Sequence, residues 1–227
     1  MKWRGLEEST PGDDTRSLRE QFAERKELIA RYVPPEIQAV HAKVVADLKA
    51  SGIAECALSL GAKAATFELK DHNGKLISSR DLLAKGPLAV LFLRGRWDPF
   101  CCGQAAAMNQ VQPRIAAAGA SLVAISPQTV PQSYFMADQH KLRFPLLSDA
   151  GNQVARHFGL VYRVPDEQQV IYRRAFVNLP FANGDESWEL PIPATYILDR
   201  DGVVAYASAN PDYTDRPEPE EILAKLA

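Results

Sequence analysis

The alternation of apolar and polar residues predicts a sheet whose strands are separated by helices. Two continuous apolar runs, 88–93 and 121–125, are typical of strands buried on both faces. Shorter apolar segments predict further strands at 144–147, 194–198 and 203–207, and Asn73-Gly74 predicts a hairpin between 65–69 and 76–77. Patterns typical of helices fall at 79–85, 99–118, 130–141, 152–158, 165–177 and 218–226. This order predicts an α/β protein with a central mixed sheet covered by helices on both faces.

Two amphipathic helices precede this body. Apolar residues recur at helical spacing from Leu18 to Tyr32, and Pro34-Pro35 ends that pattern and begins a second one, which reaches Ser51-Gly52. We therefore divide the chain into an N-terminal helical arm, residues 1–57, and a body, residues 58–227. The apolar stripes of the arm need a partner surface, which is either the chain's own body or a second copy in a homodimer.

The buried strand at 88–93 leads directly into a helix that carries two thiols. Asp98 is a favourable N-cap and Pro99 a favourable first helical residue, so Cys101 and Cys102 fall in the first turn. The N-terminus of a helix stabilises a thiolate, which is the reactive form of cysteine, although a buried cysteine can also be only a small apolar residue. Pro113 is expected to bend or split this helix.

Composition restricts the kind of protein. With 227 residues, 46% hydrophobic and 24% charged, the chain can form one sizeable core with an appendage. A net charge of −2 gives no reason to expect a nucleic acid or an anionic membrane as partner, and no apolar run is long enough to span a bilayer. Three cysteines and no secretory signal are typical of a reducing cytosol, so we expect a cytoplasmic protein.

The segment RGRWDPFCC resembles the RGGWCPYC-type motif of peroxiredoxin-like proteins of the alkyl hydroperoxide reductase/thiol-specific antioxidant (AhpC/TSA) family. The segments AKGPLAVLFLRG, LVAISPQT, FPLLSD, GNQVARHFGLV, NGDESWELPIPATYILDRDG and PDYTDRPEPEEIL extend the resemblance over nearly the whole chain. It implies a thioredoxin-like fold. Asp98 stands where the family motif has its first cysteine, whereas Cys101 keeps the second position and Cys102 is an additional neighbour.

This departure affects the chemistry that the resemblance implies. A carboxylate at Asp98 cannot form the sulfenic acid that peroxide produces on sulfur, and it raises the pKa of a nearby thiol. In the resembling proteins, Cys101 would be the resolving thiol. Helical geometry separates the side chains of Cys101 and Cys102 by about 100°, so we expect two free thiols, with Cys102 in the core. Metal binding is not expected, because no C-x2-C pair or histidine cluster is present.

Four further residues are expected near the thiols. Arg94 and Arg96 would favour a thiolate if they turn inward, and Trp97 would form a rigid wall beside the site. The resemblance places Pro193 opposite the redox motif and implies a cis Ile192–Pro193 bond. We therefore expect substrate contacts from Trp97, Pro193 and Arg94.

The resemblance implies a thiol oxidoreductase that reduces hydroperoxides or disulfides with electrons from a dithiol donor such as a thioredoxin, without an organic cofactor or metal. Because of Asp98, we expect peroxidase activity to be weak or absent unless Cys101 or Cys102 takes over the attack. Two other functional classes are also consistent with the sequence. One is a catalytically silent binding module, and the other is a redox sensor that uses one thiol, Cys101 or Cys102.

Overall fold

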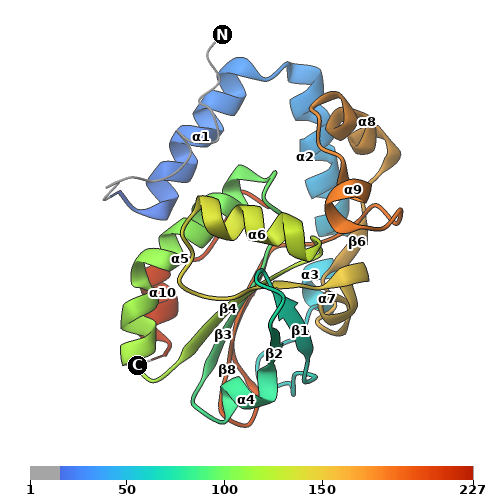
Figure 1. Cartoon of the computed structure of the whole chain (residues 1–227). Coiled ribbons are helices and arrows are strands. Elements are labelled where there is room, and N and C mark those ends of the chain that lie inside the picture. The colour runs from blue at the N-terminus through green and yellow to red at the C-terminus, as the bar shows by residue number, and fades with distance from the viewer. Residues whose placement is uncertain (1–15, 227) are drawn as a thin grey trace.

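The computed structural model describes residues 16–226, and within that range seven strands form one mixed sheet (Figure 1). The order is β2-β1-β5-β4-β3-β8-β9, in which β3, β4 and β5 are parallel and the remaining neighbours pair antiparallel. Two short strands, β6 and β7, form a separate antiparallel pair. The strands are β1 (Glu68–Asp71), β2 (Leu76–Ser78), β3 (Leu88–Phe92), β4 (Ser121–Ser126), β5 (Leu146–Ser148), β6 (Val161–Arg163), β7 (Glu189–Pro191), β8 (Ala194–Leu198) and β9 (Val204–Ala209).

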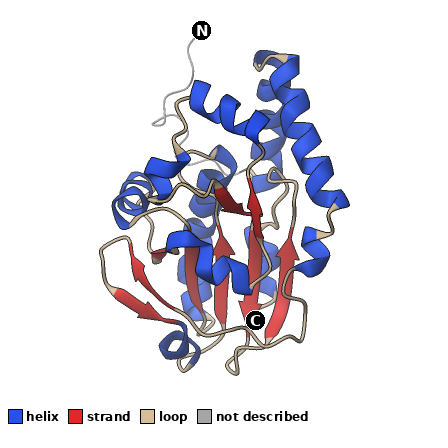
Figure 2. Ribbon diagram, turned by 90° about the vertical axis from the view of Figure 1, so that its right-hand side faces the viewer, coloured by secondary structure: helices blue, strands red, loops and turns tan. Residues whose placement is uncertain are grey.

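Helices surround the sheet, as Figures 1 and 2 show. The helices of the described residues are α1 (Leu18–Tyr32), α2 (Pro35–Ala50), α3 (Ile53–Cys56), α4 (Ser79–Leu83), α5 (Pro99–Ala117), α6 (Val130–Gln139), α7 (Gln153–His157), α8 (Asp166–Arg174), α9 (Leu179–Asn183) and α10 (Pro219–Ala224). The predicted α/β class with a central mixed sheet is confirmed. Within residues 16–226, no helix combines the length and the apolar character that crossing a bilayer requires.

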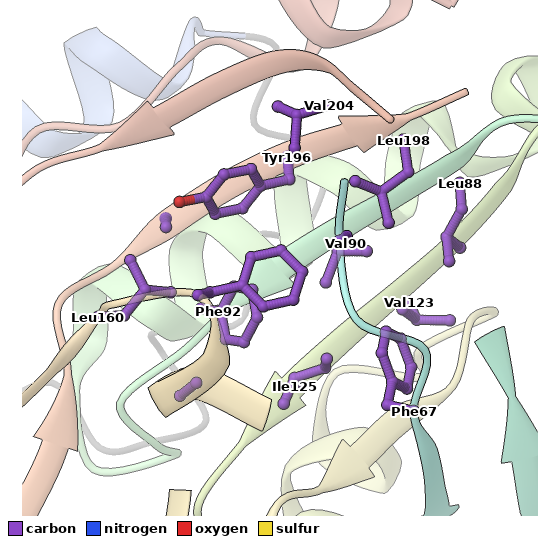
Figure 3. Packing of buried hydrophobic residues seen from close by; sticks show 14 of the residues in the cluster. Phe67, Leu88, Val90, Phe92, Val123, Ile125, Leu160, Tyr196, Leu198 and Val204 are labelled. Atoms are coloured by element: carbon purple, nitrogen blue, oxygen red, sulfur yellow. The ribbon is translucent and has the colours of Figure 1, made fainter. Parts of the chain in front are cut away.

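Strand β3 is buried on both faces, as its continuous apolar sequence predicts. Leu88, Val90 and Phe92 point into one core, which Figure 3 shows with Tyr196 of β8 beside them. The alternate residues of the same run point into a second core beneath α5. Because both faces of β3 are packed in cores, the strand has a fixed position, and the segment that follows Leu93 therefore starts from a fixed point.

The N-terminal arm packs on the chain's own body. Its helices α1 and α2 form a V beyond one end of the sheet (Figure 1). Helix α1 begins with a capping box between Ser17 and Glu20. It places the ring of Phe22 edge-on to Phe100 of α5, with the centroids 4.9 Å apart. Of the two surfaces considered for the apolar stripes, the described contacts use the body; residues 1–15, the beginning of the predicted arm, lie outside the described residues.

Two local features differ from what the sequence predicts. Pro113 does not split α5, which runs as one helix from Pro99 to Ala117, because a proline removes only one backbone donor and the alanine-rich turns around it favour the helix. The segment 178–188, in which the sequence shows no helical pattern, contains α9, whose N-cap Asn178 accepts a hydrogen bond from the Phe181 N–H. A helix of five residues is too short to show the helical period in a sequence.

Candidate active site

The segment after β3 delivers both thiols to the start of α5, as the sequence predicts. Asp98 is the N-cap, and its Oδ1 accepts a hydrogen bond from the Phe100 N–H at 3.0 Å. Pro99 is the first helical residue, so Cys101 and Cys102 are the third and fourth. Both thiols are buried, and Cys101 is 0% exposed.

Asp98 is the centre of a buried group of charges. Its Oδ2 accepts a hydrogen bond from Nε of Arg94 at 2.8 Å and lies 3.8 Å from Nη2 of Arg216. Burial alone would raise the pKa of this carboxyl, but the two guanidinium groups outweigh that effect and hold the pKa below its usual value. Asp98 is therefore ionised at neutral pH, and two buried arginines face one carboxylate.

Cys101 donates a hydrogen bond to that carboxylate. Its Sγ lies 3.0 Å from Oδ2 of Asp98, accepts the backbone N–H of Arg94 at 3.3 Å, and lies 3.7 Å from Nη2 of Arg216. Burial, and next the charge of Asp98, raise the pKa of Cys101 to about 11, against the opposing effect of Arg216 and Arg94. At neutral pH Cys101 is therefore a thiol rather than a thiolate, in spite of its position at a helix N-terminus.

The other cysteines point to different partners. Cys102 donates a hydrogen bond to the backbone oxygen of Arg96 at 3.2 Å, and burial raises its pKa. Cys56 is exposed on α3. All three cysteines are free thiols, as we expect from helical geometry for the adjacent pair.

Aromatic rings enclose the Arg94 side chain. Its guanidinium carbon lies 4.0 Å from the ring centroid of Tyr213 and 5.0 Å from that of Trp97. Trp97 in turn packs on Tyr172 of α8, with the centroids 5.0 Å apart. Trp97 is therefore a wall of the buried charge group, and Arg94 is one of its members rather than a solvated loop residue.

Sequence reasoning missed Arg216, which the fold brings to the thiol from the segment before α10. Its Nη1 donates to Oε1 of Gln104 at 2.9 Å, and its Nε and Nη2 donate to the backbone oxygen of Tyr213 at 3.0 and 2.7 Å. Gln104 also donates to Oγ1 of Thr195 on β8 at 3.2 Å. The available signal was the segment PDYTDRPEPEEIL, which contributes to the family resemblance and contains this arginine.

The prediction of a cis Ile192–Pro193 bond is wrong. The bond is trans, like the other peptide bonds of residues 16–226. Trans is the ordinary state of an X–Pro bond, and here the chain enters β8 directly, with Ala194 paired to Phe92 of β3. Pro193 is buried one residue before that strand, and its carbonyl accepts the backbone N–H of Asn210 at 3.1 Å.

A metal does not enter the description of this site. The described part of the chain contains no group of three or more His, Cys, Asp or Glu side chains arranged to hold a metal ion.

Comparison with known proteins identifies the family. Residues 60–207 match the model of the AhpC/TSA family. Peroxiredoxin Q of Sedum lineare is 32% identical over 155 residues, which are 68% of each chain, and that of Triticum aestivum is 30% identical over 171 residues, 75% of this chain and 66% of the relative. Among solved structures, peroxidoxin BcpB of Mycobacterium tuberculosis covers 74% of this chain and 96% of its own, with a TM-score of 0.59 and 24% identity. Peroxiredoxin Q of Xanthomonas campestris covers 70% and 89%, with a TM-score of 0.56 and 19% identity.

The structural likeness confirms the thioredoxin-like fold. The expectation of a cytoplasmic protein is contradicted, because both plant relatives are named as chloroplastic proteins. A low cysteine count is typical of proteins in reducing compartments, but it does not distinguish one reducing compartment from another. The match of residues 60–207, about two thirds of the sequence, shows that this chain belongs to the AhpC/TSA family.

Proposed function

We propose that the chain is a peroxiredoxin-type thiol peroxidase in which Cys101 is the attacking sulfur and Asp98 weakens the attack. The observation that carries this proposal is the contact of Cys101 Sγ with Asp98 on one side and with Arg94 and Arg216 on the other. The arginines supply the positive charge that a thiolate needs, and the carboxylate opposes it. The relatives named peroxiredoxin Q support the same class of reaction.

A hydroperoxide is the oxidant in the reaction at Cys101. The sulfur attacks the outer peroxide oxygen, the O–O bond breaks, and the thiol proton goes to the leaving oxygen, which gives a sulfenic acid and an alcohol or water. Arg216 and the backbone N–H of Arg94 lie beside the sulfur and stabilise the negative charge that develops there and on the leaving oxygen.

Burial and, next, the charge of Asp98 keep the proton on Cys101, and both therefore lower the rate. A thiol with a pKa of about 11 has roughly 0.01% thiolate at pH 7, compared with a few per cent for an ordinary cysteine. The carboxylate also stands in the motif position where resembling proteins carry a first cysteine, so the chain lacks a second sulfur at that place. We therefore expect slow peroxidase activity.

The sulfenic acid on Cys101 is reduced by a thiol donor from outside the chain. Cys102 is turned to the carbonyl of Arg96, and Cys56 lies on α3 at the surface. One donor thiol condenses with the sulfenic acid to give a mixed disulfide and water, and a second donor thiol releases Cys101 and leaves as a disulfide. A dithiol protein such as a thioredoxin supplies both thiols.

A peroxide assay combined with mass spectrometry tests this proposal. We expect slow loss of hydroperoxide in the presence of a dithiol donor, an adduct of about 16 Da on Cys101, and neither in Cys101→Ser. The variant Asp98→Cys restores the first cysteine of the family motif and should increase turnover. A Cys102→Ala variant is the matched control and should react like the wild type.

Other outcomes of this assay would indicate one of the other two functional classes, a redox sensor or a binding module. An adduct on Cys101 without turnover contradicts a peroxidase and indicates a redox sensor with one thiol. No adduct at millimolar peroxide in the wild type, together with an inactive Asp98→Cys variant, indicates a binding module.

We also propose a test of the homodimer expected through the N-terminal helices. Leu28 and Tyr32 of α1 stay 40% and 49% exposed, and a second copy would cover them. Light scattering at micromolar concentration should give the mass of two chains, and a Tyr32→Glu variant should give the mass of one. A wild-type mass of one chain contradicts the dimer.

A further inference from the structure

A cavity of about 410 Å³ lies between the N-terminal arm and the loop before α10. Its walls come from α1, from α2 and from residues 212–214. None of these residues lies within the segment 60–207 that matches the family model, so the cavity is built by the parts of this chain that lie outside the matched segment. Its volume is within the range typical of small-molecule sites.

The walls of this cavity are mainly apolar. Ile29 of α1, Val33 directly after α1, and Ala42 and Val45 of α2 line it. Two polar groups in the walls are already engaged. The amide of Gln38 donates to the Val33 carbonyl at 2.6 Å and to two further carbonyls of α1, and Asp212 accepts two hydrogen bonds from Thr214. The cavity therefore suits the apolar part of a ligand.

Two rings that line the cavity, those of His41 and Tyr213, connect it to the buried charge group. The His41 ring lies 6.3 Å from the ring of Tyr213, and Tyr213 lies directly over the guanidinium of Arg94. Nδ1 of His41 is 2.8 Å from the amide nitrogen of Gln168, and burial, then the charge of Arg94, lower the pKa of His41. The cavity is therefore polar but uncharged at His41, which favours a ligand with an uncharged head group.

We propose that this cavity binds the apolar body of an organic hydroperoxide and points its peroxide group toward Tyr213. The inference rests on the proposed function and deepens it, because it assigns the substrate specificity to the arm. A molecule with an apolar body and a small uncharged hydrogen-bonding head fits both ends of the cavity.

Tyr213 connects the cavity to the residues around the sulfur. Its ring covers Arg94, and its backbone oxygen accepts hydrogen bonds from Nε and Nη2 of Arg216, whose Nη2 is also 3.7 Å from Cys101 Sγ. A ligand that contacts Tyr213 therefore lies beside the two arginines that contact Cys101, which is itself fully buried.

Binding is tested without turnover in the Cys101→Ser variant. The probe is cumyl alcohol, the product of cumene hydroperoxide, and the readout is the methyl NMR shifts of Ile29, Val33 and Val45. We expect shifts confined to these methyl groups, and we expect Ala42→Phe in the same background, which fills the cavity, to weaken binding by roughly tenfold or more. Ala39→Phe, exposed on α2 and not a lining residue, is the matched control and should bind like the parent.

Turnover is tested separately in the wild-type background with cumene hydroperoxide and hydrogen peroxide. Ala42→Phe should raise KM for cumene hydroperoxide by roughly tenfold and affect hydrogen peroxide much less, whereas the exposed control Ala39→Phe should keep the wild-type rate with both peroxides. Absence of methyl shifts with the alcohol, or equal losses for both peroxides, overturns the inference. If shifts appear and depend on Ala42 while neither peroxide is consumed, the cavity is supported and the proposed peroxidase fails.

Discussion

Asp98 combines three interactions that usually belong to separate residues. It caps α5 through the Phe100 N–H, pairs with Arg94, and accepts a hydrogen bond from the thiol of Cys101. The cap is worth about 1 kcal/mol. Loss of one partner from a buried ion pair costs about 3–5 kcal/mol, because the other charge stays buried. The pairing with Arg94 therefore dominates the contribution of Asp98 to stability.

Two substitutions at this residue separate the cap from the charge. Asparagine is as good an N-cap as aspartate, so Asp98→Asn should lose the charge alone and destabilise the protein by about 3–5 kcal/mol. Asp98→Ala should lose about 1 kcal/mol more, because the cap is lost as well. Urea unfolding of both variants measures the difference. Two variants of equal stability would show that the cap contributes nothing.

For single residues, the sequence predicts the place of a side chain within its helix or strand better than it predicts what surrounds that side chain. The N-cap role of Asp98 and the place of Cys101 follow from residues that are adjacent in the chain. Arg216 could not be placed, because it reaches Cys101 across 115 positions of sequence. The sequence also does not show whether Arg94 points inward or into solvent. Burial, which is the largest influence on the pKa of Cys101, likewise depends on tertiary packing that the sequence does not display.

The contact between α1 and α5 depends on a glycine. A Cβ added at Gly103 would lie 2.7 Å from Cε1 of Phe22, which packs on Phe100. Alanine is favoured over glycine within a helix by about 1 kcal/mol, so the sign of Gly103→Ala depends on this contact. Gly103 therefore lies at one of the places where the arm packs on the body.

A double-mutant cycle tests that inference. Gly103→Ala should destabilise the protein by about 1–3 kcal/mol through overpacking, and Phe22→Ala by about 3–5 kcal/mol. In the Phe22→Ala background, Gly103→Ala should instead be neutral or stabilising, because the clash is absent. Thermal unfolding of the four proteins gives the coupling energy. Equal effects of Gly103→Ala in both backgrounds would refute the contact.

Whether an element could be predicted depended on its length and burial. Strands β3 and β4 are recognisable because both faces are apolar, and the helices of the arm because their stripes are long. In contrast, α3, α9, β6 and β7 have three to five residues each and show no period. Their conformations follow from caps and tertiary contacts, such as the Val164 N–H to Trp188 carbonyl bond at 2.8 Å.

At the scale of the whole molecule, His41 joins the arm to the body. It lies between Tyr172 and Tyr213, pairs with Gln168, and has a lowered pKa caused by burial and by Arg94. Its folded form is therefore neutral at a pH where the unfolded chain already binds a proton. Because the unfolded state binds more protons below the ordinary pKa of 6.5, stability rises with pH through that region and is lost as pH falls.

We therefore expect acid to weaken the protein before its carboxylates titrate. The free energy of unfolding in urea should fall between about pH 7 and 5.5, and the fall should be smaller in His41→Gln. His140 of the same chain also has a pKa lowered by burial, so some loss should remain in the variant. A flat profile in the wild type would contradict the neutral, buried state of both rings.

The central claim is that burial and, next, the charge of Asp98 hold Cys101 in its protonated form, and site-resolved NMR of cysteine Cβ tests it most directly. Between about pH 7 and 10, which spans the ordinary thiol pKa, the Cβ shift of Cys101 should stay constant in the wild type. In Asp98→Asn, the same signal should titrate at a lower pH than in the wild type, because Arg94 and Arg216 then oppose burial alone. A wild-type Cys101 that titrates at or below the ordinary value of 9.0, or a variant that titrates no earlier than the wild type, would contradict the account.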